Sequence, residues 1–251
     1  MRRRRRRTVL LLILLLALGG TAIGVTELVH RPADPPPPAA AGDRGLANGL
    51  GANAPVAPSG YPAEGSGSFA AADGNSPVRG SGGPLRRYRV AVEQGIGQDV
   101  DGFAATVDEV LGDRRSWIAS GQLRMQRVAV AAAADFTIYL ASPATSERMC
   151  AEGGLTTERY TSCRLPGQVI INLARWMDAV PDYGAPLATY RTYVINHEVG
   201  HELGEGHQAC PRPGAPAPVM QQQTYGLAGC VANAWPYVDG RRYEGAPVDG
   251  L

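Results

Sequence analysis

Residues 197–207 read HEVGHELGEGH, which is the pattern H-E-x-x-H-x-x-G-x-x-H. On a helix, His197 and His201 lie four residues apart on one face, so both imidazoles can reach one metal ion. Gly204 can adopt the left-handed conformation that ends a helix, after which the chain turns and His207 can supply a third ligand. Three protein ligands with one open position are typical of a catalytic zinc site, whereas structural sites fill all four positions. The sequence therefore predicts Zn²⁺ bound by these three histidines.

Glu198 follows the first histidine and indicates the chemistry of the site. A carboxylate beside a metal ligand can accept a proton from zinc-bound water without being a ligand itself. The only histidine outside the pattern is His30, and no G-x-S-x-G sequence occurs. We therefore expect peptide-bond hydrolysis by zinc-bound water, with Glu198 as the catalytic general base. Glu202 and Glu205 are expected on the solvated side of the helix, although Glu205 could instead orient a ligand histidine.

The extended histidine pattern resembles that of the metzincin clan of zinc metallopeptidases. The resemblance is close over residues 186–225, and the order of elements is similar over 85–225. Metzincins place a methionine in a tight turn below the metal, and Met220 lies in a Pro-Val-Met-Gln sequence thirteen residues after His207. The resemblance implies an α+β, zincin-like domain with a mixed sheet, an active-site helix and a methionine turn at Met220.

Two positions depart from the characterised metzincin subfamilies. Gln208 follows the third histidine and matches none of the residues that commonly distinguish these subfamilies. Subfamilies with a tyrosine ligand carry it two residues after the methionine, where this chain has Gln222, and the nearest tyrosine is Tyr225. The resemblance therefore does not assign the chain to one subfamily.

The N-terminus predicts export. Six arginines, Arg2 to Arg7, precede nineteen uncharged residues, 8–26, which at about 1.5 Å per residue nearly span a hydrocarbon core of about 30 Å. The arginine block favours the cytoplasmic side, which places the C-terminal domain outside the cell. Residues 1–30 then form an uncleaved signal-anchor of a single-pass cell-membrane protein. A cleaved signal peptide and a secreted product are the alternative.

Residues 31–84 contain ten prolines and eleven glycines and show no apolar periodicity. Such a segment cannot bury enough apolar surface to offset its ordering entropy, so we expect a disordered linker. Residues 85–251 are enough for one compact core, and we expect the zincin-like domain there. The layout of anchor, Pro/Gly-rich spacer and domain with four cysteines is also similar to that of uncharacterised actinobacterial envelope proteins.

Apolar periodicity predicts the elements of this domain. Alternating apolar residues around Val90 indicate a strand, and helical spacing indicates a helix after Asp99. Further strands are expected at 126–132, 136–140 and 168–173, followed by the active-site helix at about 186–204. Residues 232–251 carry little helical signal and are expected to form an irregular tail.

Four cysteines lie in the part of the chain predicted to be exported. An even count outside the cytoplasm indicates two disulfides. Sequence order favours Cys150–Cys163 and Cys210–Cys230, which is one connectivity of three. The second of these would bracket Met220 and brace the loop beneath the metal.

The formal net charge of +1 includes the six N-terminal arginines, so the rest of the chain carries −5 and no basic surface indicates nucleic acid. We expect a protein or peptide substrate and a membrane contact through the N-terminal helix, and the sequence indicates no oligomeric state. The predicted function is an exported zinc metallopeptidase. Two alternatives stay open: a zinc amide hydrolase acting on cell-wall peptides, and a non-catalytic zinc-binding envelope module.

Overall fold

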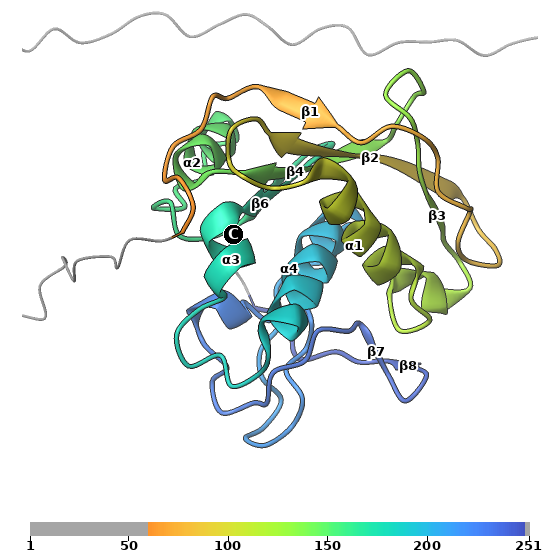
Figure 1. Ribbon diagram of the computed structural model, residues 1–251. Coiled ribbons are helices and arrows are strands. Elements are labelled where there is room, and N and C mark those ends of the chain that lie inside the picture. Colours follow the sequence, from red (N-terminus) through yellow and green to blue (C-terminus); the bar gives the residue numbers. More distant parts are fainter. Residues whose placement is uncertain (1–59, 249–251) are drawn as a thin grey trace, which may run out of the picture. The chain divides into compact units, whose positions relative to one another are not determined.

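A mixed sheet organises residues 60–248, the part of the chain that the computed structural model describes (Figure 1). The strand order is β1-β2-β4-β6-β5, and β3 pairs with the same edge of β2 as β1 does. The strands are β1 (Phe69–Ala71), β2 (Leu85–Glu93), β3 (Arg124–Arg127), β4 (Phe136–Ala141), β5 (Cys163–Leu165), β6 (Gln168–Asn172), β7 (Tyr237–Val238) and β8 (Arg241–Arg242). β2, β4 and β6 run parallel, whereas β1 and β5 run antiparallel to their neighbours. The predicted α+β fold with a mixed sheet is confirmed.

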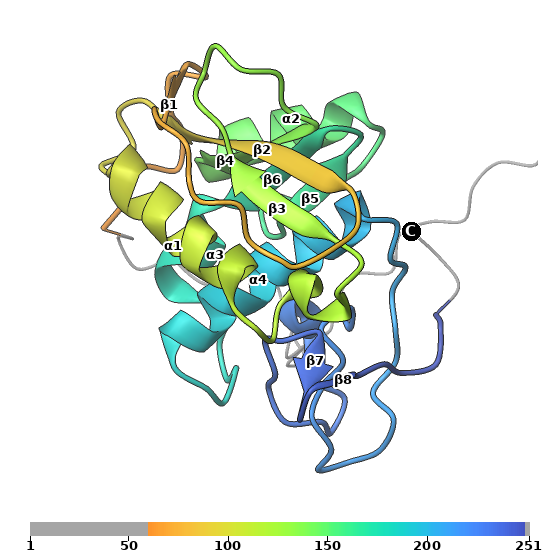
Figure 2. The ribbon, with the colours of Figure 1, turned by 90° about the vertical axis from the view of Figure 1, so that its right-hand side faces the viewer.

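Helices cover both faces of this sheet, with α2 on one face and α1, α3 and α4 on the other (Figures 1 and 2). The helices are α1 (Val100–Gly112), α2 (Pro143–Glu152), α3 (Leu173–Asp178) and α4 (Leu187–Glu202), with the 3-10 helices η1 (Trp117–Ser120) and η2 (Gln223–Tyr225). The side chains of β4 alternate between the cores on the two faces of the sheet, because successive side chains of a strand point to opposite sides. Ile138 and Leu140 lie in the larger core, and Ala141 in the smaller core that α2 covers.

Local sequence accounts for β2 and α1. Tyr88, Val90 and Val92 alternate into the core as predicted, and the Asp99 carboxylate caps α1 by accepting a hydrogen bond from Gly102 N at 2.7 Å. The strand predicted at 126–132 is only partly correct. β3 ends at Arg127 and a turn follows it, in keeping with the low strand propensity of the alanine run there.

Residues 60–84 belong to the fold, so the predicted linker boundary at residue 85 is wrong. β1 pairs with the end of β2, and the Glu93 carboxylate in β2 is 1 % exposed. That carboxylate accepts hydrogen bonds from Gly67 N, Ser142 N and Thr145 Oγ1 at 2.6–2.7 Å. Burial alone would raise the pKa of Glu93, but these hydrogen bonds hold it below its usual value. The composition of this segment did not reveal its place in the fold, because the residues that it contacts lie far along the chain.

The predicted signal-anchor in residues 1–30 and the predicted linker up to residue 59 lie outside the described residues. Among the helices of residues 60–248, none combines the length and the apolar character that crossing a bilayer requires.

Beyond α4 the chain is mostly irregular, as predicted for the tail, apart from η2 and the β7–β8 hairpin. Both predicted disulfides are present. Cys150–Cys163 joins α2 to the edge strand β5. Cys210–Cys230 closes the loop that contains Met220. The irregular segment is thus covalently fastened on both sides of the methionine.

Candidate metal centre

α4 supplies two of the three predicted ligands. Every residue from Tyr193 to Gly200 is buried, so packing on nearly all sides fixes the helix in the core. The helix ends at Glu202, and Gly204 has a φ of +98°, within the left-handed region predicted for it. The Glu205 amide then donates to the Gly200 carbonyl at 2.9 Å, and the reversed chain brings His207 back towards the helix.

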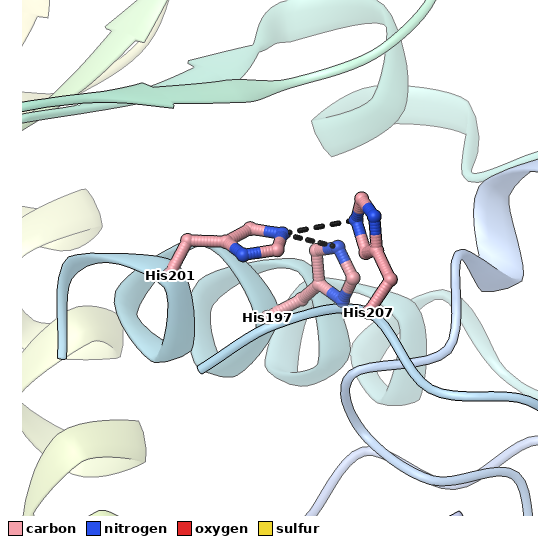
Figure 3. Close-up of side chains that lie close together, drawn as sticks. All are labelled: His197, His201 and His207. Atoms are coloured by element: carbon pink, nitrogen blue, oxygen red, sulfur yellow. Dashed lines mark hydrogen bonds between the residues drawn. The ribbon is translucent and has the colours of Figure 1, made fainter. Parts of the chain in front are cut away.

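The three imidazoles meet at their Nε2 atoms (Figure 3). His201 Nε2 lies 3.2 Å from His197 Nε2 and 3.1 Å from His207 Nε2. The ligand atoms of all three lie within 4.8 Å of one another. Zinc–nitrogen bonds of about 2.0–2.1 Å at tetrahedral angles separate ligand nitrogens by roughly 3.3 Å. The cluster His197, His201 and His207 can therefore hold a metal ion.

Backbone carbonyls orient two of these rings. His197 Nδ1 lies 2.8 Å from the Val219 carbonyl oxygen, and His201 Nδ1 lies 2.9 Å from that of Glu205. A carbonyl only accepts hydrogen bonds, so each Nδ1 carries the proton and each Nε2 keeps its lone pair. Burial lowers the pKa of His197 well below its usual value and that of His201 to about 4. Both rings are consequently neutral near pH 7, which is the form that binds metals.

Glu198 is buried beside the first ligand and lines the same cleft as the three histidines. Burial raises the pKa of its carboxyl to about 8, because the charged form loses hydration. A cation held by the histidines would oppose this shift, since opposite charge favours the carboxylate. Glu198 therefore shares its cleft with the three histidines that could hold a cation.

Met220 packs directly beneath α4. It is fully buried in a turn in which the Gln221 amide donates to the Pro218 carbonyl at 2.9 Å. A Cβ at position 200 would collide with Met220 Sδ and would lie 2.7 Å from Trp117 Cζ2. Gly200 is thus the residue that lets the methionine and the indole approach the helix, a role that sequence spacing alone did not indicate.

Asn196, which precedes the first candidate ligand, is a buried positioning residue. Its side chain is fully buried, accepts from Ser116 Oγ at 2.9 Å and donates to the Ala234 carbonyl at 2.9 Å. Its own carbonyl accepts from Trp117 Nε1 at 3.0 Å. These bonds tie the ligand-bearing turn of α4 to η1 and to the C-terminal segment. Its position next to the first histidine places it close to the cluster, but nothing in the local sequence indicates these partners.

A cleft of about 670 Å³ opens over the histidines. Three segments line it: residues 154–157 and 161–164 around β5, the ligand-bearing part of α4 with its following turn, and residues 222, 224 and 225. Gln222 and Tyr225, the two positions compared with the tyrosine-bearing subfamilies, both face this cleft, and the Tyr225 side chain is 65 % exposed. The candidate centre is therefore accessible to a molecule larger than water.

Glu202 was predicted to lie on the solvated side of the helix, and this prediction is wrong. Its side chain is only 7 % exposed and accepts from Arg164 Nε at 2.6 Å, because β5 packs over this end of the helix. Glu205 does orient a ligand histidine, but through its backbone carbonyl. Its carboxylate instead pairs with Arg242 at 3.1 Å.

Fold and centre together define an α+β domain with a histidine cluster that can hold a metal at the floor of a cleft. A family model described as "Protein of unknown function (DUF3152)" matches residues 56–238, and the chain belongs to this family. The match begins ahead of residue 60, in agreement with the corrected start of the folded part. Comparison with curated proteins and with solved structures found no match.

Proposed function

We propose that this chain is an exported zinc metallopeptidase with a metzincin-like centre. The observation that carries the proposal is the convergence of the Nε2 atoms of three histidine rings beside the buried Glu198. In two of these rings, Nδ1 is hydrogen-bonded to a backbone carbonyl. Three nitrogen ligands in a cleft leave one position open, which is the arrangement of catalytic zinc sites. Imidazole donors in near-tetrahedral spacing suit zinc better than they suit calcium or magnesium, which prefer oxygen ligands.

The chain's own residues account for the remaining chemistry. Zinc bound at this position would lower the pKa of a water ligand and polarise a substrate carbonyl. Glu198 accepts a proton from the attacking water and passes it to the leaving amine. The carbonyls of Val219 and Glu205 fix the orientation of two ligand rings. Hydrogen-bond partners of this kind behind the metal ligands sustain metal affinity. Met220 supports the helix from below, as the resemblance to metzincins implies for the methionine turn.

The cleft is large enough to admit a ligand. Its volume of about 670 Å³ lies within the usual range of ligand clefts. We propose from residues 1–30 that the domain is anchored to the membrane and lies outside the cytoplasm. The two disulfides are consistent with an oxidising compartment.

The test uses the full chain loaded with zinc and screened against unstructured proteins and cell-wall peptides near pH 7. Glu198→Gln keeps the size of the side chain but removes its basicity. We expect this variant to retain zinc and fold, and to lose turnover by at least about 100-fold, the lower end of the effect of a general base. Metal analysis and circular dichroism serve as controls.

Equal turnover by wild type and Glu198→Gln would rule out the general-base mechanism. Cleavage of cell-wall peptides with no cleavage of unstructured proteins would redirect the proposal to the amide hydrolase alternative. Tight zinc binding with no cleavage of any substrate would favour the binding module.

A further inference from the structure

Arg164 is the one arginine among the described residues that line the cleft, and the chain contains no lysine. It lies in β5, the antiparallel edge strand next to α4. Its side chain is 30 % exposed, so the guanidinium is partly open to the cleft. This cation has no part in the mechanism described above.

The geometry of the ion pair leaves the outer end of the guanidinium available. Arg164 Nε donates to Glu202 Oε2 at 2.6 Å, and the same oxygen accepts from Gly167 N at 3.2 Å. Within the described part of the chain, neither Nη atom of Arg164 has a hydrogen-bond partner. A guanidinium presents its donors in a rigid fork, and its planar edges match the two oxygens of a carboxylate. The pair with Glu202 thus fixes the direction of the fork without occupying all of it.

The protein's own charges around this fork are paired. Glu202 balances Arg164, and Glu205 is paired with Arg242 at 3.1 Å. A divalent cation on the three neutral histidines would then leave the cleft positive, since Glu198 is its one other carboxylate.

We propose that Arg164 binds a carboxylate of the peptide substrate through its Nη groups and so makes the cleft selective for acidic peptides. This proposal rests on the proposed function, because it describes the substrate of the same cleft. The carboxylate can come from an acidic side chain or from the C-terminus of the peptide, and both present the same two oxygens.

The experiment measures binding and does not require turnover. The full chain carrying Glu198→Gln is loaded with zinc and titrated with short fluorescent peptides. One series moves a single glutamate through a neutral peptide, with glutamine at the same position as its partner. A second series compares a free C-terminal carboxylate with the C-terminal amide. We expect the carboxylate form of one series to bind about 10- to 100-fold more tightly, as a charge-assisted hydrogen bond predicts.

Variants connect this selectivity to Arg164. Removing the arginine alone would leave the buried Glu202 unpaired, so the informative change is the double variant Arg164→Gln/Glu202→Gln. It should retain zinc and bind carboxylate and neutral peptides with equal affinity. The matched control Arg115→Gln/Asp113→Asn removes another Nε-bonded pair, at 2.9 Å, whose residues do not line the cleft. This control should keep the full selectivity.

Each outcome is decisive. Selectivity in the first series identifies a side-chain carboxylate, and selectivity in the second identifies a chain terminus. Equal binding of the charged and neutral forms, no binding of either, or selectivity that survives in Arg164→Gln/Glu202→Gln would each overturn the proposal. Because binding is the readout, a protein that selects carboxylates but cleaves nothing would contradict the proposed function and leave this inference standing.

Discussion

The candidate metal centre is assembled from two regions of opposite character. His197 and His201 lie on α4, whose residues are buried from Tyr193 to Gly200 and held by regular helical hydrogen bonds. His207 and Met220 lie in the segment that follows, which contains only isolated bridges and the short η2 before β7. One region is fixed by periodic packing, and the other must be fixed by specific ties.

Those ties are polar and covalent. The Gln223 side chain is fully buried and donates to the carbonyls of Pro218 and Asn233 at 3.2 and 2.7 Å. The Cys210–Cys230 disulfide closes the same segment. Irregular backbone in a protein interior needs such partners for its own polar groups, because an unpaired buried group costs about 1–3 kcal/mol. Half of the centre therefore depends on a few individual bonds.

Removing one ligand should have the largest effect, whichever region it comes from. We expect His201→Ala and His207→Ala both to lose nearly all zinc under mild chelation, because two remaining imidazoles cannot fill a three-ligand site. Metal analysis of the purified full chain checks this, with His30→Ala as the matched control. Stoichiometric zinc in either ligand variant would show that the assignment of that histidine is wrong.

Removing each disulfide in turn tests the difference between the two regions, because only Cys210–Cys230 closes the irregular segment. Loops of 13 and 20 residues are closed by Cys150–Cys163 and Cys210–Cys230, and each should contribute about 3 kcal/mol to stability. Replacing either pair by serine should therefore lower the free energy of unfolding similarly in chemical denaturation. Only Cys210→Ser/Cys230→Ser should also weaken zinc binding, by about tenfold or more, because it loosens the support of His207 and of the Val219 carbonyl. Equal zinc affinity in the two variants would remove the distinction.

Gly200 lies where the two regions touch. Gly200→Ala should destabilise the protein by about 1–3 kcal/mol, because the added methyl group collides with Met220 and crowds Trp117. Thr192→Ala, in the same helix at a half-buried position, should change stability by less than about 0.5 kcal/mol. Thermal and denaturant unfolding compare the two. A neutral Gly200→Ala would mean that the loop yields easily and packs loosely on α4.

The smallest effect is expected at Glu205, whose backbone carbonyl, and not its side chain, orients His201. Glu205→Ala removes the pair with Arg242 but keeps the carbonyl that accepts from His201 Nδ1. Stability should fall by less than about 1 kcal/mol, as for other partly exposed ion pairs, and zinc affinity should be nearly unchanged. Competition with a metal indicator measures the affinity. A tenfold loss would show that the carboxylate, and not the carbonyl, positions the histidine.

The same contrast explains what the sequence could predict. Ligands spaced four residues apart follow from helical periodicity, and alternation revealed β2 and β4, because both signals are local. Glu93 and Asn196 are buried through partners 49 and 38 residues away, Ser142 and Ala234, and no local pattern contains that information. The place of Glu202 was mispredicted for this reason too, since β5 reaches it from 38 residues upstream. Residues 60–84 looked like a linker because their composition shows none of their pairing with β2.

All three ligands come from eleven consecutive residues, 197–207. The entropy lost on closing a loop grows only with the logarithm of its length, and this loop is near the short end. If the cluster holds zinc as proposed, the ion would bind while distant parts of the chain, including the partner carbonyl of Val219, are still unordered. The free energy of metal capture then becomes free energy of folding. We expect the ion to act as an early nucleus around which the irregular C-terminal segment condenses.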